Sequence, residues 1–397
     1  MELKSRSSFR WKDSMNLTDI LNSSIVVDHG SFYLKYGFSG SEAPGFVIPS
    51  VVGAPKLSFE YQSHEDIYVG NDAIENSKTH FLNYPINDCK IENWEQMEDL
   101  WLHMFTNDLN VKSSERSMLI TDGNNLQNLE EKNKNRCHLT EIMFETYDLP
   151  ALFIENEAVL SLYAVGRTNG LVISSGYEST RFYPVYNGKN IAQSTRTMKL
   201  GGKHVTNFLR QTISFPDNIF KNSAEERMVT RILKEGLCYA AIDGTEAEVK
   251  KKIKKECYDL PDGNVIKIGD ERFFAVEGLL KPKLLGKNIP GIPEELINCL
   301  ESCDKKIHHD LCNNILLEGG NTLFTYFPER LLKELKTNPD FQNKFNKIKI
   351  VATEDRKYYP WLGGSIVSSL DTFEKFTVKK DEYFENGCEN VVAEKFN

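Results

Sequence analysis

The chain has 397 residues, of which 40% are hydrophobic and 26% are charged. This length allows two to three ordinary domains or one large fold divided by a cleft, and no run approaches the roughly 20 apolar residues of a membrane span. A net charge of -9 and a pI near 5.6 disfavour general attraction to nucleic acid or to an anionic membrane. We therefore expect a soluble globular protein without direct nucleic-acid or membrane binding.

Residues 1–24 form a predicted polar N-terminal extension. They include basic residues but no continuous apolar stretch, which argues against a secretory signal. The second residue is Glu2, so an N-myristoylation motif is absent as well. We expect a cytoplasmic or nuclear protein.

A hairpin with a polar tip is predicted directly after this extension. Residues 25–27 start a β-branched apolar strand, His29-Gly30-Ser31 form a tight turn, and residues 32–38 form the returning strand. Residues 171–176 and 180–188 repeat this pattern. Two copies of one pattern argue for two related halves.

Helices are predicted between and after the two hairpins. Residues 139–147, 156–164 and 223–239 carry helix start or stop signals, including a serine at the start of the third segment. Strands that alternate with helices indicate an α/β fold. The Asp-Gly pair within residues 259–264 predicts a turn.

A lysine-rich run and the cysteines each have a functional and a plain interpretation. Residues 249–256 could bind nucleic acid, but a solvated helix face explains them better, because no aromatic residues interleave. Cys299 and Cys303, followed by His308 and His309, could suggest a metal site. Two thiols on one helix followed by surface histidines explain them better, since no second ligand pair lies nearby. We assign no zinc and expect reduced thiols at positions 89, 137, 238, 257, 299, 303, 312 and 388.

The first hairpin has the residue types of a phosphate site. Glycine-bearing turns at strand ends point backbone N–H groups at an anion, and a lysine on the outgoing strand can place its ammonium group against a phosphate. Asp28, Ser31 and Lys35 fit this arrangement, and they also fit an ordinary polar turn. The pair Gly319-Gly320 follows an apolar strand and either lets a backbone approach a nucleotide or forms a plain strand-to-helix turn.

Short strings along the whole chain resemble actin and stand in actin's order. They cover residues 25–397 nearly end to end and identify the chain as a member of the actin family. The strings are Val26-Val27-Asp28-x-Gly30-Ser31, Pro49-Ser50-Val51-Val52-Gly53, Tyr68-Val69-Gly70, Tyr84-Pro85-Ile86, Ile142-Met143-Phe144-Glu145-Thr146, Ala158-Val159-Leu160-Ser161-Leu162-Tyr163-Ala164, Leu260-Pro261-Asp262-Gly263, Arg356-Lys357-Tyr358 and Trp361-Leu362-Gly363-Gly364-Ser365.

The resemblance implies an α/β protein with the actin-like fold. In that fold two related α/β domains, ribonuclease H-like halves that comprise four subdomains, surround a nucleotide cleft. Here the first, small domain would be residues 25–164 plus 359–397. The second, large domain would be residues 165–358.

The resemblance also implies a site for ATP or ADP with Mg²⁺. Asp28 is the candidate metal ligand. The positions similar to the family's nucleotide contacts are Asp28, Gly30, Ser31, Lys35, Gly176, Thr180, Gly202, Lys234, Glu235, Gly319, Gly320, Lys357 and Tyr358.

The positions that would serve hydrolysis differ from actin. Ser174 stands where actin has a cation-shell aspartate, and Glu157 and Arg181 stand where it has the glutamine and histidine that handle the attacking water. Glu157 with Asp28 could rebuild part of a cation site, whereas Glu178, which replaces a glycine, would repel phosphate unless its side chain turns away. Hydrolysis needs a metal-neutralised phosphate and an oriented water, so we expect no catalytic residue and only weak or structural nucleotide binding, as in a pseudo-ATPase. Two further departures are Phe32 and Tyr177.

Two segments that serve self-assembly in actin are altered. The loop at residues 57–67 is shorter, and the plug segment at residues 287–290 is unlike actin's, so we do not expect filaments of this chain alone. A helix-binding groove of the family is recognisable, and protein partners, with actin or actin-binding proteins as candidates, are expected there. Its residues are Tyr163, Gly166, Thr168, Ile366, Leu370 and Phe376.

These observations favour an actin-related subunit of the cytoskeleton or of another multiprotein assembly in the cytoplasm. One alternative is a nuclear actin-related subunit of a chromatin-remodelling complex, which would require nuclear retention. The other is an active actin-type ATPase, and the losses at Ser174 and Glu157 argue against it.

Overall fold

The structure is a computed structural model that describes residues 23–56, 67–87, 90–123, 129–216, 219–220, 223–242, 255–260, 263–345 and 347–396. Within these ranges no helix combines the length and the apolar character needed to cross a bilayer. The N-terminal extension, apart from its last two residues, and most of the loop at 57–67 and of the lysine-rich run lie outside them. The chain forms two units, which we name after the predicted small and large domains. The small unit comprises residues 23–168, 187–193 and 358–396, and the large unit comprises residues 169–186 and 194–357.

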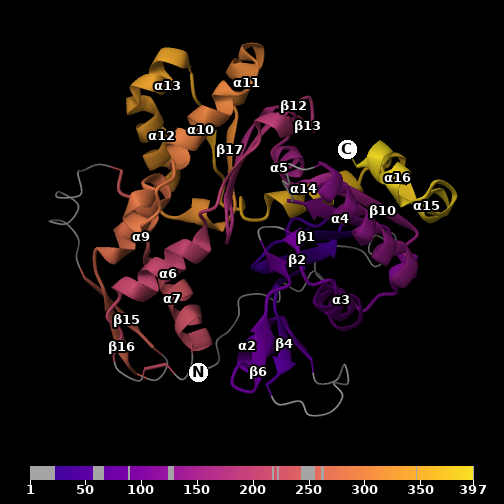
Figure 1. Ribbon diagram of the computed structural model, residues 1–397, viewed down its shortest axis with the longest axis horizontal. Coiled ribbons are helices and arrows are strands. Elements are labelled where there is room, and N and C mark those ends of the chain that lie inside the picture. Colours follow the sequence, from indigo (N-terminus) through magenta and orange to yellow (C-terminus); the bar gives the residue numbers. More distant parts are fainter. Residues whose placement is uncertain are drawn as a thin grey trace. The chain divides into compact units, whose positions relative to one another are not determined.

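The small unit contains a six-stranded sheet in the order β19-β10-β9-β1-β2-β3 (Figure 1). Strands β1, β9 and β10 are parallel, whereas β2, β3 and β19 each run antiparallel to a neighbour. The first predicted hairpin is confirmed as β1–β2. The strands are β1 (Ile25–His29), β2 (Tyr33–Phe38), β3 (Phe46–Pro49), β9 (Met118–Asp122), β10 (Ala151–Asn156) and β19 (Val378–Lys379).

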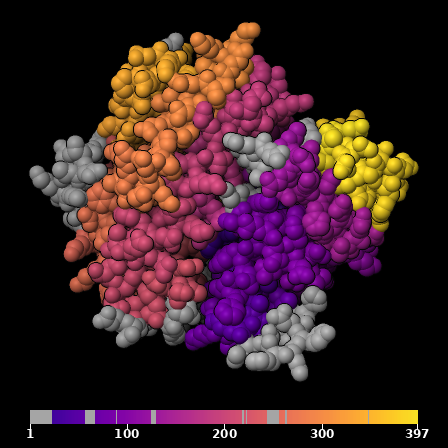
Figure 2. All heavy atoms as spheres, viewed as in Figure 1, coloured from indigo at the N-terminus to yellow at the C-terminus, as the bar shows by residue number. Residues whose placement is uncertain are grey.

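Helices and short strands complete the small unit. The C-terminal helix α16 packs against α4, and the C-terminal segment, yellow in Figure 2, covers that side of the unit. The helices are α2 (Gly70–Glu75), α3 (Trp94–His103), α4 (Leu129–Glu141), α5 (Glu157–Ala164), α14 (Tyr359–Ser368), α15 (Lys380–Asn386) and α16 (Cys388–Lys395), with π-helical turns at Met104–Asp108 and Ile142–Thr146. The remaining strands are β4 (Val52–Pro55), β5 (Tyr68–Val69), β6 (His80–Asn83), β7 (Ile86–Asn87) and β8 (Lys90–Ile91).

Glycines allow helices α5 and α14 to lie close together. A Cβ atom added to Gly363 would lie 2.5 Å from the carbonyl carbon of Leu160, and one added to Gly364 would lie 2.8 Å from a methyl group of Val26. The neighbouring Trp361 is fully buried and donates its indole N–H to the carbonyl of Val26 at 3.0 Å. Backbone-to-backbone approach therefore fixes α14 on α5 and on β1.

The large unit repeats the strand pattern of the small unit. Its sheet runs β14-β12-β11-β17-β18, with β12 and β14 antiparallel and β17 and β18 parallel to their neighbours. Read as β3-β2-β1-β9-β10, the small-unit sheet has the same order and directions, so the predicted fold of two related α/β halves is confirmed. The strands are β11 (Gly170–Ser175), β12 (Thr180–Tyr186), β14 (Arg196–Met198), β17 (Ile315–Glu318) and β18 (Ile350–Val351).

The helices of the large unit are amphipathic segments around an apolar core. They are α6 (Gly202–Thr212), α7 (Ser223–Leu237), α9 (Glu271–Leu280), α10 (Ile292–Glu301), α11 (His308–Cys312), α12 (Phe327–Thr337) and α13 (Pro339–Lys344). A separate hairpin of β15 (Glu256–Asp259) and β16 (Val265–Ile268) flanks the predicted Asp-Gly turn, of which Gly263 has φ +87° and Asp262 lies outside the described residues.

Three details of the sequence interpretation were wrong. The predicted helix at 223–239 ends at Leu237, and Tyr239 instead forms an isolated bridge to Thr325. Glu256, expected at the end of a lysine-rich helix, pairs with Ile268 in a hairpin. Cys303 lies beyond the last residue of α10, so the two thiols do not share one helix. At Tyr239 and Glu256 a contact distant in sequence overrides the local helical pattern, whereas at Cys303 the helix has already ended.

Candidate functional site

The first hairpin brings Asp28 and Lys35 together. The two residues are partners in the β1–β2 register, and the Lys35 ammonium group forms an ion pair with Asp28 Oδ2. Thr121, at the end of β9, donates its hydroxyl to Asp28 Oδ1 at 2.8 Å. Both oxygens of this buried carboxylate therefore already accept hydrogen bonds from the protein.

Ser50 fixes the tip of this hairpin. Its backbone N–H donates to the carbonyl of Phe32 at 2.9 Å, and its hydroxyl donates to the carbonyl of Gly30 at 2.7 Å. A side chain at Gly30 would lie 2.5 Å from the Tyr33 carbonyl oxygen, so the turn requires glycine. The Phe32 ring, where the resemblance implies glycine, stacks on Tyr84 with centroids 6.3 Å apart.

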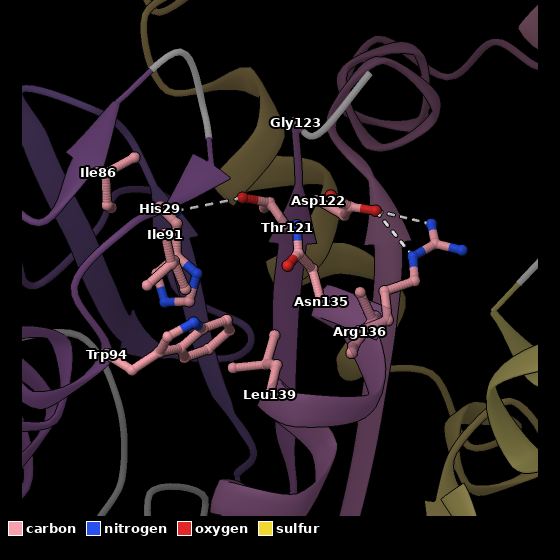
Figure 3. A pocket seen from close by; sticks show the side chains of 11 residues that line it. His29, Ile86, Ile91, Trp94, Thr121, Asp122, Gly123, Asn135, Arg136 and Leu139 are labelled. Atoms are coloured by element: carbon pink, nitrogen blue, oxygen red, sulfur yellow. Dashed lines mark hydrogen bonds and ion pairs between the residues drawn. The ribbon is translucent and has the colours of Figure 1, made fainter. Parts of the chain in front are cut away.

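A small cavity of about 50 Å³ lies beside this hairpin (Figure 3). In that view His29, Ile91 and Trp94 face Asn135 and Arg136 across the cavity. A water molecule needs roughly 10–15 Å³ of such a volume, so the cavity has room for a few waters and is too small for a nucleotide. The complete lining is His29, Ile86, Ile91, Trp94, Thr121, Asp122, Gly123, Asn135, Arg136, Leu139 and Ile154.

His29 is held neutral in the wall of this cavity. Trp101 donates its indole N–H to His29 Nε2 at 3.0 Å, which places the imidazole proton on Nδ1. Burial lowers the pKa of His29 from 6.5 to about 4, although Asp28 and Asp122 both raise it. The sequence interpretation treated His29 only as a turn residue.

Acid should therefore destabilise the small unit in a defined pH window. In the unfolded chain His29 binds a proton below about pH 6.5, whereas in the native protein it does so only near its pKa of about 4. The free energy of unfolding should fall as the pH drops through this window, by up to about 1.4 kcal/mol per pH unit. Urea midpoints measured across the window would show a flatter profile for His29→Gln, which retains an acceptor for Trp101 but does not titrate. Parallel profiles would contradict the assignment.

The second hairpin has a network of hydroxyl and amide groups at its tip. Ser175 Oγ and Thr180 Oγ1 lie 2.9 Å apart, and Thr180 donates to the carbonyl of Leu200 at 2.8 Å. The Asn321 amide donates to Ser175 Oγ at 3.2 Å and to the carbonyl of Gly176 at 2.6 Å. Asn321 was missed because nothing in the sequence indicates that it meets this turn.

Three buried polar residues form a row across the second hairpin and the strand beside it. Ser174 of β11 pairs with Arg181 of β12 on one side and with Glu318 of β17 on the other. All three are buried. The corresponding row of the first hairpin is Lys35, Asp28 and Thr121. The carboxylate of that row is on the hairpin strand β1, whereas the carboxylate of the second row is on β17, the counterpart of β9.

The side chain of Glu178 forms an ion pair with a lysine. Its carboxylate lies 3.3 Å from the Lys203 ammonium group in the first turn of α6. The backbone N–H of Lys203 also donates to the carbonyl of Tyr177 at 2.6 Å. These contacts tie the altered turn, Tyr177 and Glu178, to the start of α6.

Several predicted nucleotide contacts meet in the large unit. Lys234 is buried, and its ammonium group donates to the carbonyl of Gly202 at 3.4 Å. Burial lowers the pKa of Lys234 to about 8, although Glu235 raises it. A side chain at Gly202 would lie 2.8 Å from Asn321 Oδ1, whereas Gly320 has open space around the position of a Cβ atom.

The other predicted contacts lie at the edges of this region. Gly319 has φ +91° and packs so closely on Ser175 that only glycine fits there. Glu235 pairs with Arg231 at 3.4 Å and is half exposed. Lys357 is the last residue of the large unit, and Tyr358 belongs to the small unit.

The structure describes no cluster of three or more His, Cys, Asp or Glu side chains with metal-binding geometry. Cys299 donates its thiol to the carbonyl of Ser194 at 3.2 Å, and Cys303 donates to the carbonyl of Cys299 at 3.3 Å. A hydrogen bond with Cys299 lowers the pKa of the Cys303 thiol, although burial raises it.

The predicted partner groove consists of residues at the ends of α5 and α14, which contact each other. Ile366 in α14, Leu370 just beyond its end and Phe376 after the turn at Phe373–Lys375 are 46%, 50% and 47% exposed, so each apolar side chain is accessible. Tyr163 lies in the last turn of α5, and Gly166 and Thr168 follow that helix. That this surface binds a partner helix stays a prediction.

One comparison with known families bears on the whole chain. A family model described as Actin matches residues 21–397. The matched range includes both hairpins, both sheets and every predicted nucleotide contact.

Proposed function

This chain belongs to the actin family, and from that premise we propose that it is an actin-related subunit of the cytoskeleton or of another cytoplasmic assembly that does not hydrolyse ATP. The main support is the state of the two hairpins. At the first, Asp28 is held by Lys35 and Thr121. At the second, the equivalent position is Ser174.

Hydrolysis of a nucleoside triphosphate needs a cation on the phosphates and a group that orients water. A serine hydroxyl is a poor substitute for a cation-binding carboxylate. Arg181 cannot accept a proton from water, because a guanidinium stays protonated at any physiological pH. Glu157 is buried at the first position of α5. It would have to help bind the cation and also orient the attacking water.

The large unit nevertheless retains groups that fit a nucleotide. Gly320 leaves open space for a close approach, and Gly176 has only one atom, at 3.8 Å, near the position of a Cβ atom. The N–H of Gly176 and the hydroxyl of Thr180 already donate to the carbonyls of Ser179 and Leu200, so the support comes from the space that the glycines leave. We propose that such a nucleotide is bound weakly or as a structural element, without turnover.

Two measurements on the purified full-length protein test the proposal. Denaturing the protein and separating the released small molecules should show whether ADP or ATP was carried along, and steady-state assays should show no saturable ATP hydrolysis. Saturable hydrolysis that Asp28→Ala abolishes would refute the proposal, because contaminating ATPases would not respond to that substitution.

We also propose that assembly depends on other proteins. In polymerising salt the protein alone should stay in the supernatant after high-speed centrifugation, because the segments that serve self-assembly in actin are altered. Leu370→Arg, at a half-exposed position, should abolish binding of an actin-binding partner while leaving the melting temperature unchanged. Sedimentation of the isolated protein would contradict the first expectation.

A further inference from the structure

The buried row Arg181–Ser174–Glu318 differs from its counterpart in the order of its charges. In the first hairpin the base Lys35 lies beside the acid Asp28, and the hydroxyl of Thr121 lies beyond it. In the second hairpin Arg181 lies beside the hydroxyl of Ser174, and the acid lies one strand further away. Arg181 and Glu318 are thus two strand spacings apart, about 9–10 Å between backbones.

The row lies close to the carboxyl ends of β11 and β17, on the face of the sheet opposite to that of Ile173, Phe182 and Leu317. Ile173, Phe182 and Leu317 each precede or follow a member of the row and belong to the core of the large unit. Side chains alternate along a strand, so the row faces the opposite side of the sheet. It also lies next to Gly176 and Gly319, at the carboxyl ends of β11 and β17, where α/β sheets bind ligands.

These residues do not fit a divalent cation. Mg²⁺ requires hard oxygen ligands in near-octahedral geometry and is usually bound by one or two carboxylates. The central position carries a hydroxyl, and the guanidinium beside it repels a cation. The one carboxylate of the row, Glu318, lies two strands away from Arg181, and a buried arginine needs a compensating negative charge. Asp28 of the first hairpin is already held through both oxygens.

The same residues suit an anion. A guanidinium offers five N–H donors in a planar fork, so it can serve a carboxylate and a phosphate at once. The charge that Mg²⁺ supplies to phosphates in most nucleotide sites is then supplied by the side chain. We propose that the large unit binds a nucleoside di- or triphosphate without a divalent cation, with Arg181 as the counter-charge. This inference rests on the nucleotide site of the proposed function.

Calorimetric titration of the full-length protein with ADP tests the proposal. Affinity in EDTA should equal that in Mg²⁺ within about twofold, whereas Arg181→Gln should lower it by roughly tenfold or more in both buffers, as expected for loss of a charge-assisted contact. Arg196→Gln, on the neighbouring strand β14, is the matched control and should bind like the parent protein.

The same titrations can separate a folding defect of Arg181→Gln from a loss of ADP binding. If Arg181→Gln does not fold because Glu318 stays buried without its counter-charge, the double variant Arg181→Gln/Glu318→Gln removes both charges and should fold but bind ADP weakly. A tenfold loss of affinity in EDTA would overturn the inference, and so would absence of ADP binding in both buffers. Neither result would affect the proposed non-hydrolysing function, which only saturable ATP turnover refutes.

Discussion

Replacing Arg136 by alanine should lower the free energy of unfolding by about 3–5 kcal/mol. The Arg136 guanidinium donates to Asp122 Oδ2 from two nitrogens, at 2.8 and 2.7 Å, and also donates to the carbonyl of Phe396. Both side chains of the ion pair are at most 10% exposed. The substitution leaves a buried carboxylate without its main partner and removes the hydrogen bond between α4 and the carbonyl of Phe396.

Tryptophan fluorescence during urea denaturation is the appropriate measurement for Arg136→Ala. Trp94, Trp101 and Trp361 all lie in the small unit, as Arg136 does. The matched control is Lys134→Ala on the same helix, whose ion pair with Glu130 is exposed on both sides and should contribute nothing measurable. Burial lowers the pKa of Lys132, although Asp122 lies close enough for its carboxylate to raise it. A loss below about 1 kcal/mol for Arg136→Ala would contradict the prediction and would mean that Lys132 compensates Asp122 instead.

Gly363→Ala should destabilise the protein by about 3 kcal/mol or more, or prevent folding. The added methyl group would lie 2.5 Å from the carbonyl carbon of Leu160 and closer still to its oxygen. These are backbone atoms of α5, so no side-chain rotation relieves the overlap. The helices would have to separate, and the apolar surface at Ile366 and Leu370 would change with them.

The control for this substitution is Gly236→Ala in α7. Nothing lies within 4 Å of the position of a Cβ atom at Gly236, and its backbone is helical. Alanine there should raise stability by about 0.5–1 kcal/mol, because glycine is the poorer helix former. Thermal unfolding followed by circular dichroism compares the two variants. Equal melting temperatures for Gly363→Ala and the parent would show that α14 does not need this close approach.

Local patterns predicted the elements of this fold well where the signal was strong. The β-branched run before Asp28 and the glycine after it define the first hairpin, and the same features define the second. Asn156 was the predicted start of a helix, and its side chain indeed caps α5 by accepting the N–H of Ala158 at 3.0 Å. Short segments such as Glu256 were misassigned, because strand pairing with a distant partner decided their conformation.

The sequence by itself determined the family and the identities of the altered positions. Motifs along residues 25–397 indicated actin, and Ser174, Arg181 and Glu157 could be identified without coordinates. Ser174 and Arg181 lie on the two strands of one hairpin, so their spacing in the sequence and the alternation of side chains along a strand were enough to identify them.

Only the tertiary structure decided what surrounds those positions. Thr121 meets Asp28, Asn321 meets Gly176, and Glu318 lies beside Ser174 because parallel strands bring segments far apart in the chain into register. A parallel pairing depends on long connections and on the whole sheet, so a single sequence does not specify which residues become neighbours. The position of Glu318 beside Ser174 is therefore a property of the folded protein, and the proposed metal-free anion site depends on it.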